Sequence, residues 1–74
     1  MPERTALANY IKDFRKTHRE SQEEFAENCG LSKDFLSLVE RERANPSLEA
    51  MQKIASYTGE TVAEILTIKK KDEE

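Results

Sequence analysis

Residues 21–41, SQEEFAENCGLSKDFLSLVER, decide the fold, because two short apolar-faced segments meet there across a single glycine. In the first segment Phe25 and Cys29 lie four residues apart, and in the second Leu36 and Val39 lie three apart. Side chains at these spacings share one face of a helix. The stretch therefore predicts two short amphipathic helices joined by a tight turn.

Residues that commonly begin or end helices lie at the expected ends of these two helices. Ser21 and Glu24 have the S-x-x-E spacing of a capping box, in which two side chains satisfy backbone groups at the start of a helix. Gly30 stands where the first helix must stop, because a residue without Cβ enters the left-handed conformation at no steric cost. Ser32 can cap the second helix. Two helices joined in this way form a helix-turn-helix, whose second helix can enter the major groove of DNA.

Three further helices are expected around this pair. Apolar side chains at helical spacing predict one over residues 3–17, one between Ser47 and Gly59, and a short one that opens at Thr61. No stretch alternates like a strand. The expected fold class is all-α, a compact bundle of five helices in which the second and third form the helix-turn-helix.

The length and composition of the chain favour one intracellular domain. We assign residues 1–68 to it and expect residues 69–74, which have no apolar side chain to bury, to fray. The single cysteine excludes an internal disulfide, and no signal peptide or long apolar run is evident, so a cytoplasmic protein without membrane contact is expected. With one histidine, His18, and no glycine-rich phosphate loop, we expect no enzyme, metal site, cofactor or small-molecule ligand.

The net charge argues against a nonspecific nucleic-acid binder. The chain carries −3 at pH 7, whereas the electrostatic footprint of such a binder is basic. Residues 47–74 hold four lysines against six acidic residues and contribute −2, which leaves −1 for residues 1–46. The part of the chain that contains the helix-turn-helix is therefore nearly neutral rather than basic.

With these residues in view, the chain resembles the phage-repressor and Cro-type helix-turn-helix family, also called the xenobiotic-response-element family. The resemblance runs from about Ile11 to Leu66. It implies a lambda-repressor-like bundle and a sequence-specific transcriptional regulator of double-stranded DNA, usually a repressor. Because so small a surface makes few base contacts, we expect a homodimer on an inverted-repeat operator. The motifs that carry the resemblance are Ile11-x-x-Phe14-Arg15, Ser21-Gln22-x-x-Phe25-Ala26, Gly30-Leu31-Ser32, Leu36-Ser37-x-Val39-Glu40-Arg41 and Asn45-Pro46-Ser47-Leu48.

The resemblance also implies roles for individual residues. A helix starting near Ser32 would read the major groove, and the loop after it would approach phosphates. Arg15 and Glu40 match a pair that forms a buried salt bridge between the first and third helices in relatives. The side chains expected to bind DNA are Gln22, Ser32, Lys33, Asp34, Ser37, Arg41, Arg43 and Asn45.

Side-chain chemistry leaves alternatives open at several of these positions. The amide of Gln22 can pair with adenine or donate to a phosphate, or it can be a solvated group at a helix start. Lys33 can reach guanine or a phosphate. Asp34 can accept from cytosine N4, or it can be favoured simply by the dipole of its helix. Ser37 can let the helix approach base edges or be an ordinary exposed serine. Leu38 can touch a thymine methyl group, cover the next helix or meet a partner.

Two further expectations concern Glu42 and the end of the chain. Relatives usually have glycine where this chain has Glu42, so we expect the third helix to run on by a turn. Ile65, Leu66 and Ile68 are expected to form the dimer surface, because an apolar group at a chain end has little left to cover it. The alternative function is a protein-interaction module on the same fold, such as an antitoxin or adaptor, which the acidic balance favours.

Overall fold

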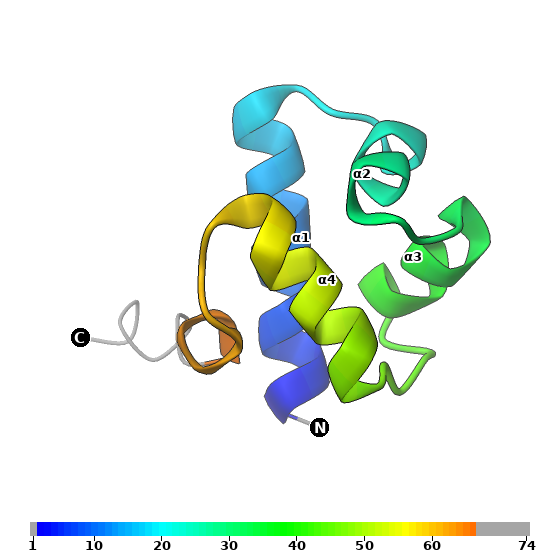
Figure 1. The fold of residues 1–74 in the computed structure, drawn as a ribbon. Coiled ribbons are helices and arrows are strands. Elements are labelled where there is room, and N and C mark those ends of the chain that lie inside the picture. The colour runs from blue at the N-terminus through cyan, green and yellow to red at the C-terminus, as the bar shows by residue number, and fades with distance from the viewer. Residues whose placement is uncertain (1, 67–74) are drawn as a thin grey trace.

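Five helical segments make up residues 2–66, the part of the chain that the structure, a computed structural model, describes (Figure 1). No strand occurs within these residues. The predicted all-α bundle of five helices is therefore confirmed, whereas the predicted tail over residues 69–74 and Ile68 lie outside the described residues. The segments are α1 (Pro2–His18), α2 (Gln22–Cys29), α3 (Lys33–Glu40), α4 (Leu48–Thr58) and a short helix over residues 62–66.

The capping box predicted at the start of α2 is formed. The Ser21 hydroxyl oxygen accepts a hydrogen bond from the Glu24 backbone N–H at 3.0 Å, and Glu24 Oε1 accepts one from the Ser21 N–H at 2.9 Å. At the other end of α2, Gly30 has φ +82°, in the left-handed region. The Leu31 N–H then donates to the carbonyl oxygen of Ala26 at 2.8 Å. This closure turns the chain directly into α3 and produces the short turn of the helix-turn-helix.

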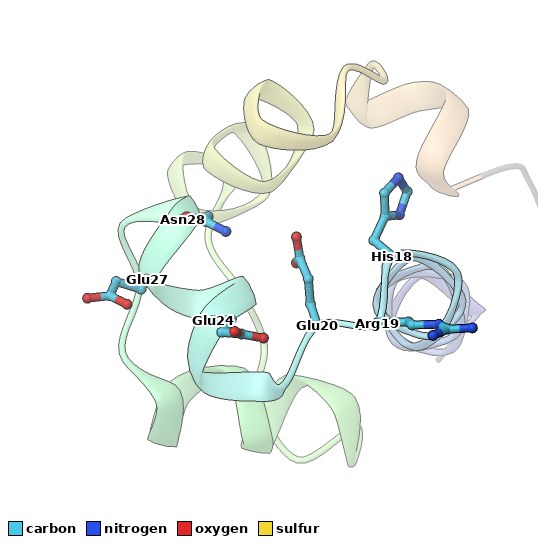
Figure 2. A pocket seen from close by; sticks show the side chains of 6 residues that line it. All are labelled: His18, Arg19, Glu20, Glu24, Glu27 and Asn28. Atoms are coloured by element: carbon cyan, nitrogen blue, oxygen red, sulfur yellow. The ribbon is translucent and has the colours of Figure 1, made fainter.

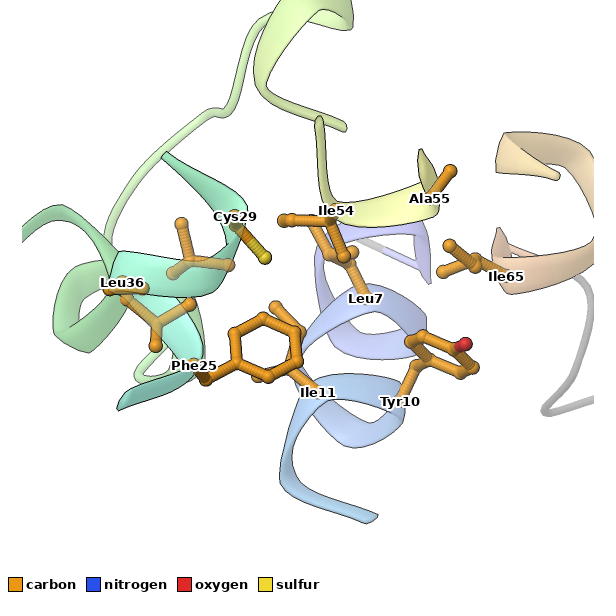
Figure 3. Close-up of a cluster of buried hydrophobic side chains, with 11 residues drawn as sticks. Leu7, Tyr10, Ile11, Phe25, Cys29, Leu36, Ile54, Ala55 and Ile65 are labelled. Atoms are coloured by element: carbon orange, nitrogen blue, oxygen red, sulfur yellow. The ribbon is translucent and has the colours of Figure 1, made fainter. Parts of the chain in front are cut away.

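The hydrophobic core gathers side chains from all five helical segments (Figure 3). Phe25, Leu36 and Ile54, from α2, α3 and α4, are each fully buried. Leu7 and Ile11 of α1 belong to the same cluster. Full burial of one such side chain stabilises a fold by roughly 1.5–3 kcal/mol. The helices are therefore held in place chiefly by this one core.

The core also contains Ile65, which corrects the predicted dimer surface. Ile65 is 1% exposed and packs in the same cluster as Tyr10 of α1 and Ala55 of α4 (Figure 3). The short last helix folds back over its own chain, so this side chain is covered without a partner. Leu66 is only half-buried, and Ile68 lies outside the described residues. Of the three predicted residues, Ile65 is thus unavailable to a second copy.

The described helices contain neither a membrane span nor a metal cluster. Within residues 2–66 no helix combines the length and apolar character needed to cross a bilayer. Over the same residues, no three His, Cys, Asp or Glu side chains are grouped so that they could hold a metal ion. His18 instead stacks on Phe14, with 4.0 Å between the ring centroids.

Cys29 is a core side chain with an unreactive thiol. It is 7% exposed and lies in the cluster formed by α1, α2, α3 and α4. Burial, with a smaller contribution from the negative charge of Glu20, raises the pKa of the Cys29 thiol from 9.0 to about 11. The thiol therefore stays protonated at neutral pH and acts as a small apolar group.

We expect Cys29 to react slowly with an aromatic disulfide reagent in the folded protein. At about pH 8 the raised pKa leaves roughly 100-fold less thiolate than an ordinary cysteine carries, and burial adds a steric barrier. The rate of absorbance change should be compared between the native chain and the chain in concentrated urea. Equal rates in the two conditions would contradict the placement of Cys29 in the core.

Candidate nucleic-acid interface

The N-terminal part of α3 is exposed on one side of the molecule. Lys33 and Asp34 are exposed, whereas Leu36 and Val39 are buried in the core. In Figure 1, α3 lies at the edge of the bundle, away from the helical residues 62–66. The helix is therefore anchored by one face and presents another face to solvent, as an element that enters a groove must do.

Two serines border the exposed face of α3. The Ser32 hydroxyl oxygen accepts a hydrogen bond from the Phe35 backbone N–H at 3.1 Å and so caps the helix, while its own hydrogen remains available to a phosphate. Ser37 is half-buried. Lys33, Ser37 and Arg41 follow one another at intervals of four residues and therefore share a face. A small side chain between two cations allows a close approach to this face.

A partly buried ion pair joins α1 to α3 behind the exposed face. Arg15 Nε donates to Glu40 Oε2 at 2.7 Å, and Arg15 Nη2 donates to Glu40 Oε1 at 2.9 Å. Arg15 Nη1 also donates to the backbone carbonyl of Glu20, just before α2, at 3.0 Å. The hydrogen bond to Glu40 raises the pKa of Arg15, so the guanidinium stays charged. This is the pair that the family resemblance implies.

Gln22, the first residue of α2, is connected to the same ion pair. Its side-chain Nε2 donates to Glu40 Oε1 at 3.1 Å. Gln22 is half-buried and lies beside the last residue of α3 rather than beside its exposed beginning. The Gln22 amide is thus attached to the end of α3, whereas Lys33 and Asp34 lie at its beginning.

The loop after α3 corrects the prediction that this helix runs on by a turn. α3 ends at Glu40, and Glu42 has φ +59°, a left-handed conformation that is uncommon for a residue with a side chain. The Arg43 N–H donates to the Leu38 carbonyl at 2.8 Å, which closes the helix as a glycine would. Glu42 Oε1 accepts a hydrogen bond from the Thr5 hydroxyl of α1 at 2.7 Å. Tertiary contact therefore supports a conformation that local preference disfavours.

The donors predicted in this loop all reach solvent. Arg41, Arg43 and Asn45 are exposed. Together with Lys33, the two arginines give the exposed surface of α3 and its loop three positive charges, compared with two negative charges from Asp34 and Glu42. This surface is slightly basic on a chain of net charge −3. The charge is therefore segregated, as binding of a polyanion by an acidic protein requires.

Acidic side chains collect on α2 and at Glu20, just before it. An open hollow of about 330 Å³ is lined there by six residues, three of which are glutamates (Figure 2). The Tyr57 hydroxyl donates to the Glu20 carboxylate, and this hydrogen bond raises the pKa of Tyr57. Asn28 Nδ2 donates to the Tyr57 oxygen at 3.0 Å. Carboxylates repel phosphate, so this side does not suit a nucleic acid. The lining residues are His18, Arg19, Glu20, Glu24, Glu27 and Asn28.

Sequence reasoning missed two contacts that shape the site. The hydrogen bond from Thr5 to Glu42 joins residues 37 apart, and that from Gln22 to Glu40 joins residues 18 apart. No local motif signals either contact. A glutamate where glycine is usual was the only sign that something else must hold the loop. Leu38, left open between three roles, is 39% exposed beside this loop.

A capped pair of short helices, with the second exposed beyond a glycine turn, defines a helix-turn-helix protein. The sequence model of the helix-turn-helix family matches residues 11–65. The chain therefore belongs to the helix-turn-helix family.

Named relatives support the same assignment. A hypothetical transcription factor of Neisseria meningitidis is 38% identical over 63 residues, which are 85% of this chain and 59% of the relative. The immunity repressor protein of Bacillus phage phi105 is 38% identical over 56 residues, 76% of this chain and 39% of the repressor. The predicted resemblance to phage repressors is confirmed. The chain thus spans less than two thirds of the length of these relatives.

The fold is similar to that of a solved structure. The crystal structure of a hypothetical transcription factor from Neisseria matches with a TM-score of 0.81 at 37% sequence identity. The match covers 88% of this chain and 73% of that chain.

We expect the Glu42→Gly variant to be more stable than the Glu42→Ala variant by about 1 kcal/mol. Both variants lose the hydrogen bond to Thr5, and only alanine keeps a Cβ in the left-handed conformation. Urea unfolding followed by circular dichroism measures the difference in free energy of unfolding. An alanine variant as stable as the glycine variant would show that Glu42 does not adopt this conformation in solution.

Proposed function

We propose that this chain is a sequence-specific DNA-binding transcriptional regulator that places α3 in the major groove. The observation that carries the proposal is the division of α3, which buries Leu36 and Val39 and leaves Lys33 and Asp34 exposed. The groove is about 12 Å wide and admits one helix. Two relatives are named as a transcription factor and an immunity repressor, and these names favour a regulator over an enzyme. We propose that the regulator is a repressor.

The exposed beginning of α3 is suited to reading base edges. The Lys33 ammonium can donate to O6 and N7 of guanine, and the Asp34 carboxylate can accept from N4 of cytosine. Asp34 also repels phosphates, so it lowers affinity for any duplex while favouring one that offers cytosine at the right place. Ser37, small and half-buried, lets the helix approach closely.

Phosphate contacts would come from both ends of α3. Arg41, Arg43 and Asn45 are exposed donors after the helix, and the Ser32 hydroxyl is a donor before it. Such contacts fix the register of a protein on a duplex without reading its sequence. Gln22, at the start of α2, has an amide that can contact the backbone and the adjacent base.

We further propose that the protein acts as a homodimer on an inverted repeat in the cytoplasm. One copy offers few cations, so a single half-site would be bound weakly, and two copies related by a twofold axis would double the contacts. Half-sites would then lie about 34–36 Å apart. Leu66, which is half-buried at the edge of the described residues, remains a candidate for the contact between copies.

We expect in-vitro selection from random duplexes to enrich a short inverted repeat. Sedimentation equilibrium should show two copies of the full chain on one enriched duplex. An unenriched pool would argue against the regulator. A tight protein partner whose binding is insensitive to salt would then point to an interaction module on the same fold.

The Lys33→Ala variant should bind the enriched duplex about 10-fold more weakly than the wild-type protein. Its midpoint urea concentration for unfolding should be the same as that of the wild type. Lys16→Ala on α1 removes the same charge from an exposed position outside the proposed surface, so it is the matched control and should change affinity much less. Fluorescence anisotropy across a salt series measures both variants. Equal losses of affinity in the two variants would mean that Lys33 contributes to binding only through its positive charge and contacts no base.

A further inference from the structure

Glu40 accepts a hydrogen bond from a proposed DNA-contacting side chain, although it cannot reach DNA itself. It is 4% exposed at the end of α3, and its Oε1 accepts from Gln22 Nε2 at 3.1 Å. Gln22 is half-buried, and its amide has a second N–H and an acceptor oxygen besides the N–H that donates to Glu40. A buried carboxylate therefore makes a hydrogen bond with a side-chain amide of the proposed interface.

The chemistry of this contact determines which way the amide faces. An ionised carboxylate only accepts hydrogen bonds, whereas a glutamine amide has a donor end and an acceptor end. The donor end of Gln22 must therefore face Glu40, because the acceptor end would be repelled by the negative charge. Arg15 holds the Glu40 carboxylate in place by donating to both of its oxygens, at 2.7 and 2.9 Å.

The position of the Gln22 backbone is held by the same arginine. Arg15 Nη1 donates at 3.0 Å to the carbonyl of Glu20, two residues before Gln22. The capping box of Ser21 and Glu24 fixes the first turn of α2 around it. The Arg15–Glu40 pair thus positions both the start of α2 and the Gln22 amide.

We propose that Glu40 is a positioning residue for base selection, because it holds the Gln22 amide in one orientation. This inference rests on the proposed DNA-binding function. Held in this way, the amide presents its oxygen and its remaining N–H in a fixed order. That order matches adenine, which offers a donor at N6 and an acceptor at N7, and does not match guanine, which offers two acceptors.

The test measures base preference with a duplex that the wild-type protein has selected from a random pool. Each position is replaced by the other bases, and Gln22→Ala identifies the position that Gln22 reads. At that position Glu40→Gln should reduce the preference for adenine by about 10-fold, because a neutral amide can also donate to the Gln22 oxygen. In a Gln22→Ala background, Glu40→Gln should have no further effect on preference.

Two control variants separate positioning from loss of stability. Arg15→Lys weakens the same ion pair but keeps a cation beside the Glu40 carboxylate. The carboxylate still only accepts hydrogen bonds, so this variant should lose stability and retain the preference for adenine. Glu24→Gln makes the same chemical change two residues from Gln22, in the capping box rather than at the amide, and should also retain it. A Glu40→Gln variant that loses affinity equally for all bases would overturn the proposal. If Gln22→Ala changes no preference, the proposed contact of Gln22 fails, and the positioning role fails with it.

A measurement on the wild-type protein covers the case in which Glu40→Gln does not fold. The chain has two glutamines, and Gln52 is exposed on α4. In a nitrogen–proton correlation spectrum, one side-chain amide proton of Gln22 should be shifted downfield and exchange with water at least about fivefold more slowly than those of Gln52. Gln22 resonances that match those of Gln52 would overturn the proposal.

Discussion

The ion pair between Arg15 and Glu40 is the constraint around which the interface is built. It ties the last turn of α1 to the end of α3, and through the Glu20 carbonyl it also holds the start of α2. Such a pair adds little net stability, yet loss of Arg15 would leave the buried Glu40 charge without its partner, which costs about 3–5 kcal/mol when both partners are buried. That cost approaches the whole stability of many small domains. Stability and the geometry of the interface therefore depend on the same charges.

The exposed face of α3 exists only because its other face is buried. A helix of eight residues is too short to be stable alone in water. Leu36 and Val39 attach it to the core, and Ser32 and Gly30 settle where it starts and how the chain reaches it. Rigid attachment matters for recognition, since a helix that is already ordered does not have to be ordered again when it binds.

Charge and backbone strain are both distributed unevenly over this small chain. Acidic side chains gather on α2, while the cations of α3 and its loop lie away from them, so a chain of net charge −3 still offers a surface for a polyanion. In that loop Glu42 holds a left-handed conformation that glycine would adopt without cost. The contact with Thr5 compensates part of the strain, and it connects the loop to the first helix.

The helices, the caps at their starts and the helix-turn-helix could be predicted from the sequence, because periodicity and capping act within three or four residues. Ser21, Gly30 and Ser32 could be interpreted without knowing what surrounds them. The exposure of Lys33 and Asp34 was implied by the family resemblance, which assigned both side chains to DNA binding. The folded chain alone showed that Ile65 is buried, that α3 ends at Glu40 and that Gln22 faces Glu40. Those outcomes depend on contacts between segments far apart in the chain, and the energy of packing them together can override a local preference.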